Sequence, residues 1–298
     1  MLDYAALSAL AAVVREGSFE RAARALSVTP SAISQRIRLL EERLGCALVV
    51  REQPCRPTET GRRLCQHVDR VRLLEQELEG AVPALAPDGM VRVPLPVAVN
   101  ADSLATWIIP ALAATTGFLF DLVIDDQDVS QDWLKRGEVV AAVTSHAGPL
   151  QGCDTLPLGA LRYRATASPG YVRRWFPNGL TSDALADAPA ITFSDNDRLQ
   201  IDWVARHIRP ARRAAFPSHR MASSQAFVDA CLHGLGWAMN PDPLAAPHLA
   251  AGTLVDLAPG TPLDVPLHWQ FTRLAAPALA PVTEAIRRAA RAILVQPG

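Results

Sequence analysis

Three stretches between residues 4 and 45 carry apolar residues at the spacing of amphipathic helices. Their apolar stripes are Tyr4, Leu7, Leu10 and Val14; then Phe19, Ala22, Ala23 and Leu26; then Ile33, Ile37, Leu40 and Leu44. Ser18 and Thr29 are suitable N-caps for the second and third helices. Pro30 suits a first helical position, and Gly45 can end the third helix in a left-handed conformation. The pattern predicts two helices joined by a tight turn at residues 27–29, preceded by one more helix.

The third helix has a polar face opposite its apolar stripe. Ser31, Ser34, Gln35 and Arg38 lie at positions i, i+3, i+4 and i+7, which share one side of a helix. Hydroxyl, amide and guanidinium groups on such a helix can reach base edges and phosphates in the major groove of DNA. The alternative is an ordinary solvated helix surface. The coincidence of turn, caps and polar face favours DNA recognition.

The residues after Gly45 predict a wing beside this helix-turn-helix. Residues 48–51 have the pattern of a strand, and residues 54–57 that of the tip or return of a hairpin. Residues 1–58 are therefore expected to form a winged helix-turn-helix domain. The expected DNA contacts come from the polar helix face and the wing: Thr29, Pro30, Ser31, Ser34, Gln35, Arg36, Arg38, Arg51 and Arg56.

A long helix is predicted to follow from Thr58, which can cap it. Its apolar stripe consists of Leu64, Val68, Val71, Leu74 and Leu78. Such a stripe needs a partner, and the same helix of a second subunit is the simplest one. The alternative is packing on its own domain. Pro83, Pro87 and Gly89 then mark a linker, so residues 59–89 are expected to form a dimerisation helix and hinge.

Beyond residue 90, strands and helices alternate, which is typical of α/β folds with parallel sheets. Strands are predicted at 97–99, 120–124, 139–144, 161–167, 190–193, 236–239, 253–257 and 267–272. Helices are predicted at 103–115, 129–136, 169–176, 197–208, 223–233 and 279–294. Pro94 and Pro96 lack ladder donors, so the first strand is expected to start late or to lie partly at an edge.

Composition supports this organisation. A length of 298 residues predicts two or three domains, and an apolar content of 49% is enough for substantial cores. The net charge is −1, but residues 1–65 hold ten arginines against seven acids, so this part carries +3 and the rest −4. The excess positive charge lies where phosphates would be met.

Other classes of protein find little support. The five cysteines include no CxxC pair and no histidine at zinc-ligand spacing, which predicts free thiols and no bound metal or other cofactor. The apolar N-terminal run is short and contains an acid, unlike a signal peptide, and no stretch of 18 uninterrupted apolar residues exists. We therefore expect a cytoplasmic protein with no membrane partner. No GxSxG motif or glycine-rich phosphate loop supports an enzyme such as a hydrolase.

The N-terminal residues resemble those of the LysR-type transcriptional regulators. The resemblance rests on Phe19, Ala22, Ala23, Leu26, Ser31, Ala32, Ile33, Ser34, Ile37, Leu40, Glu41, Leu44, Gly45, Leu48, Arg51, Thr58, Glu59 and Gly61. Further segments resemble one branch, the arginine- and lysine-responsive regulators of amino acid export, also described as replication-initiation inhibitors. They are RPTETG at 56–61, VNADSLATW at 99–107, RGEVVAAV at 136–143, FPNG at 176–179 and SSQAFV at 223–228.

The resemblance implies a periplasmic-binding-protein-like effector domain of two α/β lobes. The chain crosses between the lobes twice in that fold. Here the crossings are expected near residues 162 and 267, so residues 90–162 and 268–298 would form lobe 1 and residues 163–267 lobe 2. A small metabolite, lysine or arginine, is expected to bind between the lobes.

Several residues are candidates for binding that metabolite. Asn100, Asp102, Ser103 and Thr106 begin a helix after a strand, where backbone donors and hydroxyls suit a carboxylate. Asp102 either meets an ammonium group or caps the helix. Asp125 and Asp126 follow the second strand, at the edge where such folds bind ligands, and either recognise a cation or are solvated acids or a helix cap. In the other lobe, one of Ser223 and Ser224 should cap a helix and the other face the ligand.

The sequence therefore predicts a homodimeric or tetrameric regulator that binds promoter DNA, senses lysine or arginine, and acts on RNA polymerase. It would control an amino acid exporter or a related metabolic gene. The alternative is an architectural or replication-inhibiting DNA-binding protein with little effector control.

Overall fold

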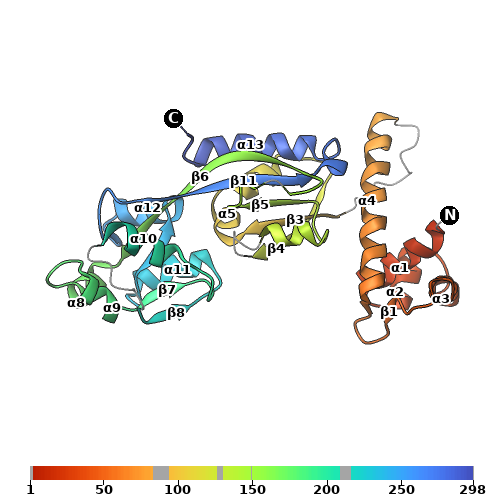
Figure 1. The fold of residues 1–298 in the computed structure, drawn as a ribbon, viewed down its shortest axis with the longest axis horizontal. Helices are drawn as coiled ribbons and strands as arrows, with labels where there is room; N and C mark the ends of the chain where they lie inside the picture. The colour runs from red at the N-terminus through yellow and green to blue at the C-terminus, as the bar shows by residue number, and fades with distance from the viewer. Residues whose placement is uncertain (1–2, 83–93, 126–129, 149, 209–215, 298) are drawn as a thin grey trace. The chain divides into compact units, whose positions relative to one another are not determined.

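The computed structural model describes residues 3–82, 94–125, 130–148, 150–208 and 216–297. The chain forms two compact units, residues 1–93 and residues 94–298, which are described separately below (Figure 1). Among the described residues, no helix is both long and apolar enough to cross a membrane.

The first unit is a winged helix-turn-helix followed by a long helix. Its elements are α1 (Tyr4–Glu16), α2 (Phe19–Ala25), α3 (Pro30–Leu44), β1 (Val49–Val50), β2 (Arg56–Pro57) and α4 (Glu59–Ala81). The predicted caps are confirmed: Ser18 and Thr29 accept backbone N–H groups of α2 and α3, and Gly45 ends α3 at φ +68°. The apolar stripes predicted for the first three helices pack around Leu7, Leu10, Ile33 and Ile37 at the centre of the unit, except for their end members Tyr4 and Leu44, which are exposed.

The long helix α4 belongs in part to this core. Val68 is buried in the core and Leu64 packs against it, so this half of the predicted stripe is covered by its own domain. Leu74 and Leu78 are exposed, at 40% and 52%. Polar contacts also join α4 to α1, because Arg15 lies 3.4 Å from the carboxylate of Asp69. Burial raises the pKa of Asp69 from its ordinary value.

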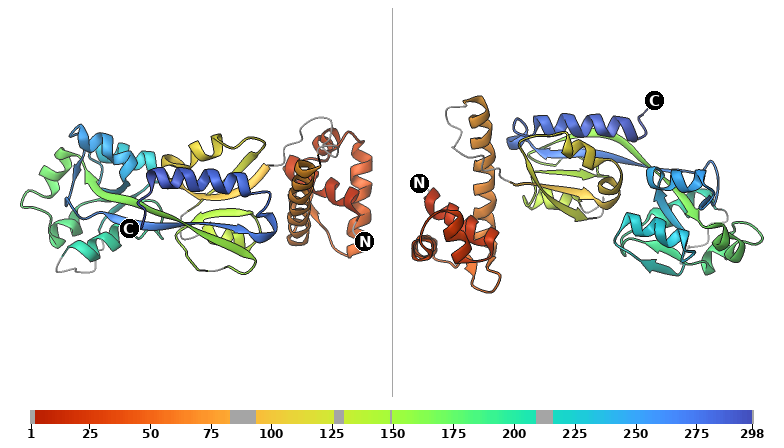
Figure 2. Two further views of the ribbon diagram at one scale, coloured as in Figure 1. Left: turned by 90° about the horizontal axis from the view of Figure 1, so that it is seen from above. Right: turned by 180° about the vertical axis from the view of Figure 1, so that it is seen from behind.

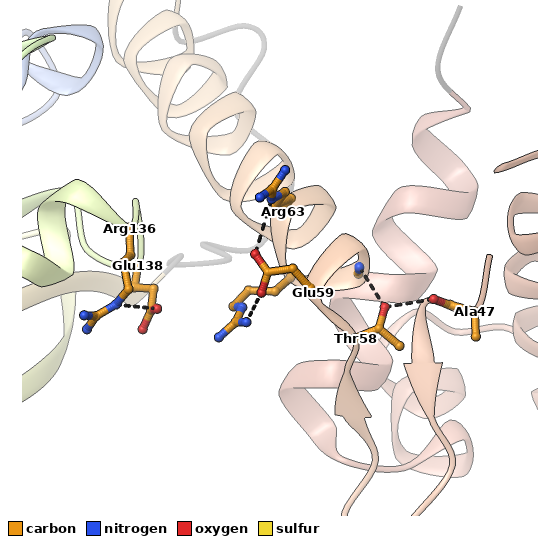
Figure 3. Close-up of polar contacts among 8 residues, drawn as sticks. Ala47, Thr58, Glu59, Arg63, Arg136 and Glu138 are labelled. Carbon is orange, nitrogen blue, oxygen red and sulfur yellow. Dashed lines mark hydrogen bonds and ion pairs between the residues drawn. The ribbon is translucent and has the colours of Figure 1, made fainter. Parts of the chain in front are cut away.

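The start of α4 is fixed against the wing by backbone contacts (Figure 3). The Thr58 hydroxyl donates to the carbonyl of Ala47 at 2.8 Å and accepts the Gly61 N–H at 3.1 Å. The Thr58 N–H donates to the carbonyl of Leu48 at 3.0 Å. This approach leaves no space for a side chain at Gly61, where an added Cβ would lie 2.0 Å from the Leu48 oxygen.

The second unit has two lobes joined by two long strands, β6 (Cys153–Ala167) and β11 (Leu263–Thr272), which pair antiparallel from Cys153 to Tyr163 (Figures 1 and 2). Lobe 1 contains β3 (Pro94–Asn100), α5 (Ala101–Thr106), α6 (Ile108–Ala113), β4 (Leu119–Asp125), α7 (Ser130–Lys135), β5 (Ala141–Thr144), the 3-10 turn η2 (Arg273–Ala275) and α13 (Ala280–Ile293). Lobe 2 contains α8 (Pro169–Trp175), α9 (Ser182–Asp187), β7 (Ala190–Thr192), α10 (Leu199–His207), β8 (Ser218–Arg220), α11 (Ser224–Leu232), β9 (Ala238–Pro241), α12 (Asp242–Ala250) and β10 (Val255–Asp256).

The α/β fold class is confirmed, but the main sheet is mixed rather than parallel. Its strand order is β10-β6-β11-β5-β3-β4, with β9 also paired to β6. In this sheet, β3 runs parallel to β4 and β5, whereas β6 and β11 run antiparallel because the chain leaves lobe 1 along β6 and returns beside it along β11. Helix α13 packs against α6 and β6, and Thr283 accepts the indole N–H of Trp269 at 3.0 Å.

One local expectation was wrong, and another was confirmed in part. The helix predicted at 103–115 is two helices, since Pro110 has no N–H for the carbonyl of residue 106 and its ring clashes with a continuous helix. Strand β3 begins at Pro94 and pairs with β4 along its whole length. The expected late start is therefore wrong. The expected edge position is confirmed on the β5 side, where the ladder begins only at Val97. The Pro96 carbonyl accepts the Val140 N–H on that side, so the N–H that Pro96 lacks would also point there.

We expect Gly61→Ala to destabilise the first unit by about 1–3 kcal/mol, because the added methyl group must displace the Leu48 backbone. Amide hydrogen exchange of α1 and α4 in the full chain would measure the loss as faster exchange. Thr60→Ala is the control, since Thr60 is exposed in the same turn. Unchanged exchange in Gly61→Ala would contradict the close approach.

Candidate DNA interface and ligand pocket

The polar face of α3 is presented to solvent. Ser31, Gln35 and Arg38 are exposed, and Ser34 and Arg36 are half-buried. At the start of the helix, Thr29 Oγ1 accepts the Ala32 N–H at 3.2 Å and lies 3.0 Å from Ser31 Oγ. Thr29 and Pro30 are both exposed. The buried stripe of α3 on the other side therefore orients these groups outward together.

Arg38 is the most accessible cation of this face. Its side chain is 72% exposed, and its Nε donates to Glu42 Oε1 at 2.8 Å. A solvent-exposed ion pair of this kind contributes about 0.2–1 kcal/mol. A phosphate can therefore replace Glu42 as the partner of Arg38 at little cost.

The wing is anchored to the end of α3. Glu41 Oε1 accepts the N–H groups of Leu48 and Val49 at 2.8 and 3.4 Å. The Arg51 guanidinium lies 3.9 Å from Glu41 and 5.4 Å from the centre of the Phe19 ring. These contacts hold Arg51 at a defined place, while Arg56 on β2 is exposed at the return of the wing.

The second unit contains a pocket of about 200 Å³ bordered by both lobes and the strand β11. Lobe 1 contributes Asn100, Ala101 and Asp102. Lobe 2 contributes Phe193, Asn196, Asp197, Arg198, Leu199, Asp202, Arg206, Ser224, Phe227 and Met239, and β11 contributes Leu263, Asp264, Val265 and Pro266. Helices α5 and α11 are in contact beside it.

Charged side chains of the pocket are organised by specific partners. The Tyr163 hydroxyl donates to Asp102 Oδ2 at 2.7 Å. Arg162 donates to both carboxylate oxygens of Asp264 at 2.8 Å, and this hydrogen bonding raises the pKa of Arg162 from its ordinary value. Arg198 pairs with Asp202 at 3.5 Å. The pocket thus has four aspartates and two arginines in its wall, an excess of negative charge.

Two buried polar atoms of the pocket residues lack a protein partner. Asn100 and Ser224 are 3% and 4% exposed, and neither Asn100 Oδ1 nor Ser224 Oγ has a hydrogen-bond partner among the described residues. Such orphaned groups are costly unless a ligand or water satisfies them. Both groups are therefore available to a polar ligand.

Three of the other predicted ligand contacts, Ser103, Thr106 and Ser223, do not line the pocket. The Ser103 hydroxyl is buried and lacks a partner, but Ser103 does not line the pocket. Thr106 donates its hydroxyl to the Asp102 carbonyl at 2.5 Å, and Ser223 caps α11 by accepting the Ala226 N–H at 3.3 Å. Asp125 is the last residue of β4, in register with Asn100, and Asp126 lies outside the described residues.

The pocket residues within 193–206 and those from β11 were not predicted from the sequence. A signal for the first group existed, because residues 193–199 follow the strand β7 and lead into a helix, as residues 100–103 do after β3. Asp197 fixes the turn between this strand and the helix, because its carboxylate accepts the N–H groups of Phe193 and Leu199 at 2.9 and 3.0 Å. No local sequence pattern indicates that Asp264, on the second crossing strand β11, borders a pocket.

Comparisons with known proteins agree with both units. Residues 4–62 match the bacterial regulatory helix-turn-helix proteins of the lysR family, and residues 85–292 match the LysR substrate binding domain. The HTH-type transcriptional regulator ArgP of Pseudomonas aeruginosa (strain UCBPP-PA14) is 45% identical over 288 residues, covering 95% of this chain and 94% of ArgP. The chain belongs to the LysR family.

Solved structures of LysR-type proteins show the same fold. ArgP from Mycobacterium tuberculosis has a TM-score of 0.81 at 40% identity, with 100% of both chains covered. Full-length LysG from Corynebacterium glutamicum, with bound effector Arg, has a TM-score of 0.68 at 34% identity, with 99% of this chain and 100% of LysG covered. The first unit is thus a DNA-binding domain, and the LysR family consists of regulators rather than enzymes.

We expect Arg38→Ala to weaken operator binding about tenfold and to reduce the salt slope of binding by about one, as the loss of one phosphate contact does. Gel shifts at several salt concentrations would measure both quantities. Arg43→Ala, on the same helix but outside the polar face, is the control. If Arg38→Ala binds the operator with wild-type affinity, Arg38 does not contact the DNA.

Proposed function

We propose that this LysR-type regulator senses a basic amino acid, lysine or arginine, and controls transcription of an amino acid exporter or a related metabolic gene. The observation that carries the proposal is the excess of carboxylates around the pocket. The wall contains Asp102, Asp197, Asp202 and Asp264 but only two arginines. Arg162 binds Asp264 from outside the pocket wall. When this third arginine is counted as well, the carboxylates are still in excess.

The size and polarity of the pocket also favour a small polar metabolite. A volume of about 200 Å³ lies below the range of roughly 300–1,000 Å³ that drug-sized ligands occupy. The orphaned groups of Asn100 and Ser224 can hydrogen-bond an amino acid. The similar LysG structure, whose bound effector is Arg, supports the same ligand class.

The proposed output is promoter binding by paired helix-turn-helix units. In this proposal Thr29, Pro30, Ser31, Ser34, Gln35, Arg36, Arg38, Arg51 and Arg56 contact DNA. Subunits associate into dimers or tetramers through α4 and the effector domain, and the assembly acts on RNA polymerase in the cytoplasm. The exposed Leu74 and Leu78 support pairing through α4, since apolar side chains on a long helix are stabilised by a partner. The domain boundaries expected at residues 58, 89, 162 and 267 belong to the same proposal.

We expect Asp102→Asn to lower the affinity for arginine and lysine at least tenfold, because the amide retains the shape of the carboxylate but removes its charge. Calorimetric titration of the full chain with each amino acid would measure this loss. Asp229→Asn, on the exposed side of α11, is the control for a charge change elsewhere in lobe 2. Absence of any wild-type response to arginine and lysine would refute the proposed function.

We expect Leu78→Asp to shift the assembly toward monomers, because a carboxylate cannot be buried against a second α4 without a large desolvation cost. Leu78 is outside the core of its own domain, so folding of the first unit should be preserved. Sedimentation velocity would measure the assembly state. Leu78→Met retains the apolar bulk and should behave as wild type; an unchanged assembly in Leu78→Asp would exclude this helix face from the interface.

A further inference from the structure

The start of α11 has the features of an anion site. The helix spans nine residues, and Ser223 caps it by accepting the Ala226 N–H. The next residue, Ser224, lines the pocket, is 4% exposed, and has no hydrogen-bond partner for Oγ among the described residues. A helix N-terminus carries a partial positive charge and favours anionic groups. A buried hydroxyl at this point therefore suits a carboxylate.

A cation lies on α10, another helix of the same lobe. Arg198, Asp202 and Arg206 occupy positions i, i+4 and i+8 of one side of α10 and its cap, and all three line the pocket. Arg198 is paired with Asp202, whereas Arg206 has no ion pair or hydrogen bond with a described residue. Its guanidinium can form two parallel hydrogen bonds to a carboxylate.

Lobe 2 contributes two carboxylates that already have partners: Asp197 accepts two backbone N–H groups, and Asp202 pairs with Arg198. The other two carboxylates of the wall lie outside lobe 2. Asp102 comes from lobe 1 and Asp264 from β11, and both are negative groups in the pocket wall. The Asp102 carboxylate lies in the first turn of α5, so this end of lobe 1 repels an anion. The Ser103 hydroxyl, which the sequence suggested as a carboxylate ligand, is outside the wall.

We propose that Ser224 and Arg206 of lobe 2 bind the carboxylate of the effector, while its cationic groups face Asp102 and Asp264. This assignment rests on the proposed function and adds the orientation of the ligand. It also adds a rule of specificity. The site selects an amino acid, and a decarboxylated amine with the same cationic side chain loses the contacts with lobe 2.

Paired ligands test the assignment. Arginine and agmatine share the guanidinium chain, but agmatine lacks the carboxylate, and argininamide replaces it with a neutral amide. We expect Ser224→Ala and Arg206→Gln to lower arginine affinity about tenfold each in calorimetric titrations of the full chain. The affinities for agmatine and argininamide should stay at wild-type levels, so the preference for arginine should fall by the same factor. Arg206→Lys keeps the charge and should recover part of the arginine affinity.

Gln225→Ala on α11 and Arg173→Gln on α8 are the control variants, because both residues are exposed in lobe 2 and lie outside the pocket. Both variants should bind arginine as the wild type does. Equal losses for all three ligands in Ser224→Ala or Arg206→Gln, or unchanged arginine affinity, would overturn the orientation while leaving basic amino acid sensing intact. A wild-type protein that binds neither arginine nor lysine would instead refute the proposed function, and the orientation with it.

Discussion

The antiparallel pairing of β6 with β11 is the constraint on which the second unit depends. The two strands connect the lobes, and their register places Tyr163 opposite Leu263 and Arg162 opposite Asp264 at the border of the pocket. Near the middle of the pair the register shifts at Leu267, opposite Gly159. Gly159 has φ +114°, and an added Cβ would lie 2.7 Å from the Val295 oxygen, so the irregularity requires glycine.

Features with local causes could be predicted from the sequence. Ser18, Thr29 and Thr58 cap their helices through side chains that accept the N–H group three residues later, and such bonds need no knowledge of the rest of the fold. The same is true of Gly45 at the end of α3. The first unit was therefore predicted almost completely.

Features that depend on distant partners could not be predicted in the same way. The first half of β6 contains Pro157 and Gly159, which interrupt a strand pattern, and only its pairing with β11 makes it a strand. The pocket has the same origin, because Asp102, Arg206 and Asp264 are separated by more than fifty residues along the chain. Ser224 was identified only as one of two serines, and the structure distinguishes it from the capping Ser223 by burial.

A ligand changes the balance between two arrangements of a protein only by binding them unequally. In the proposed orientation, a basic amino acid has one end on α11 and α10 and the other near Asp102 and β11. The length of the ligand then sets the distance between the groups of the two lobes that contact it. An arrangement that moves these groups apart loses ligand contacts at one end. The Tyr163 hydroxyl hydrogen-bonds Asp102, which faces the cationic end of the ligand in this orientation. Ligand contacts at Asp102 therefore act directly on β6, a strand that connects the lobes. Unequal binding thus follows from placing opposite charges of the ligand on opposite lobes.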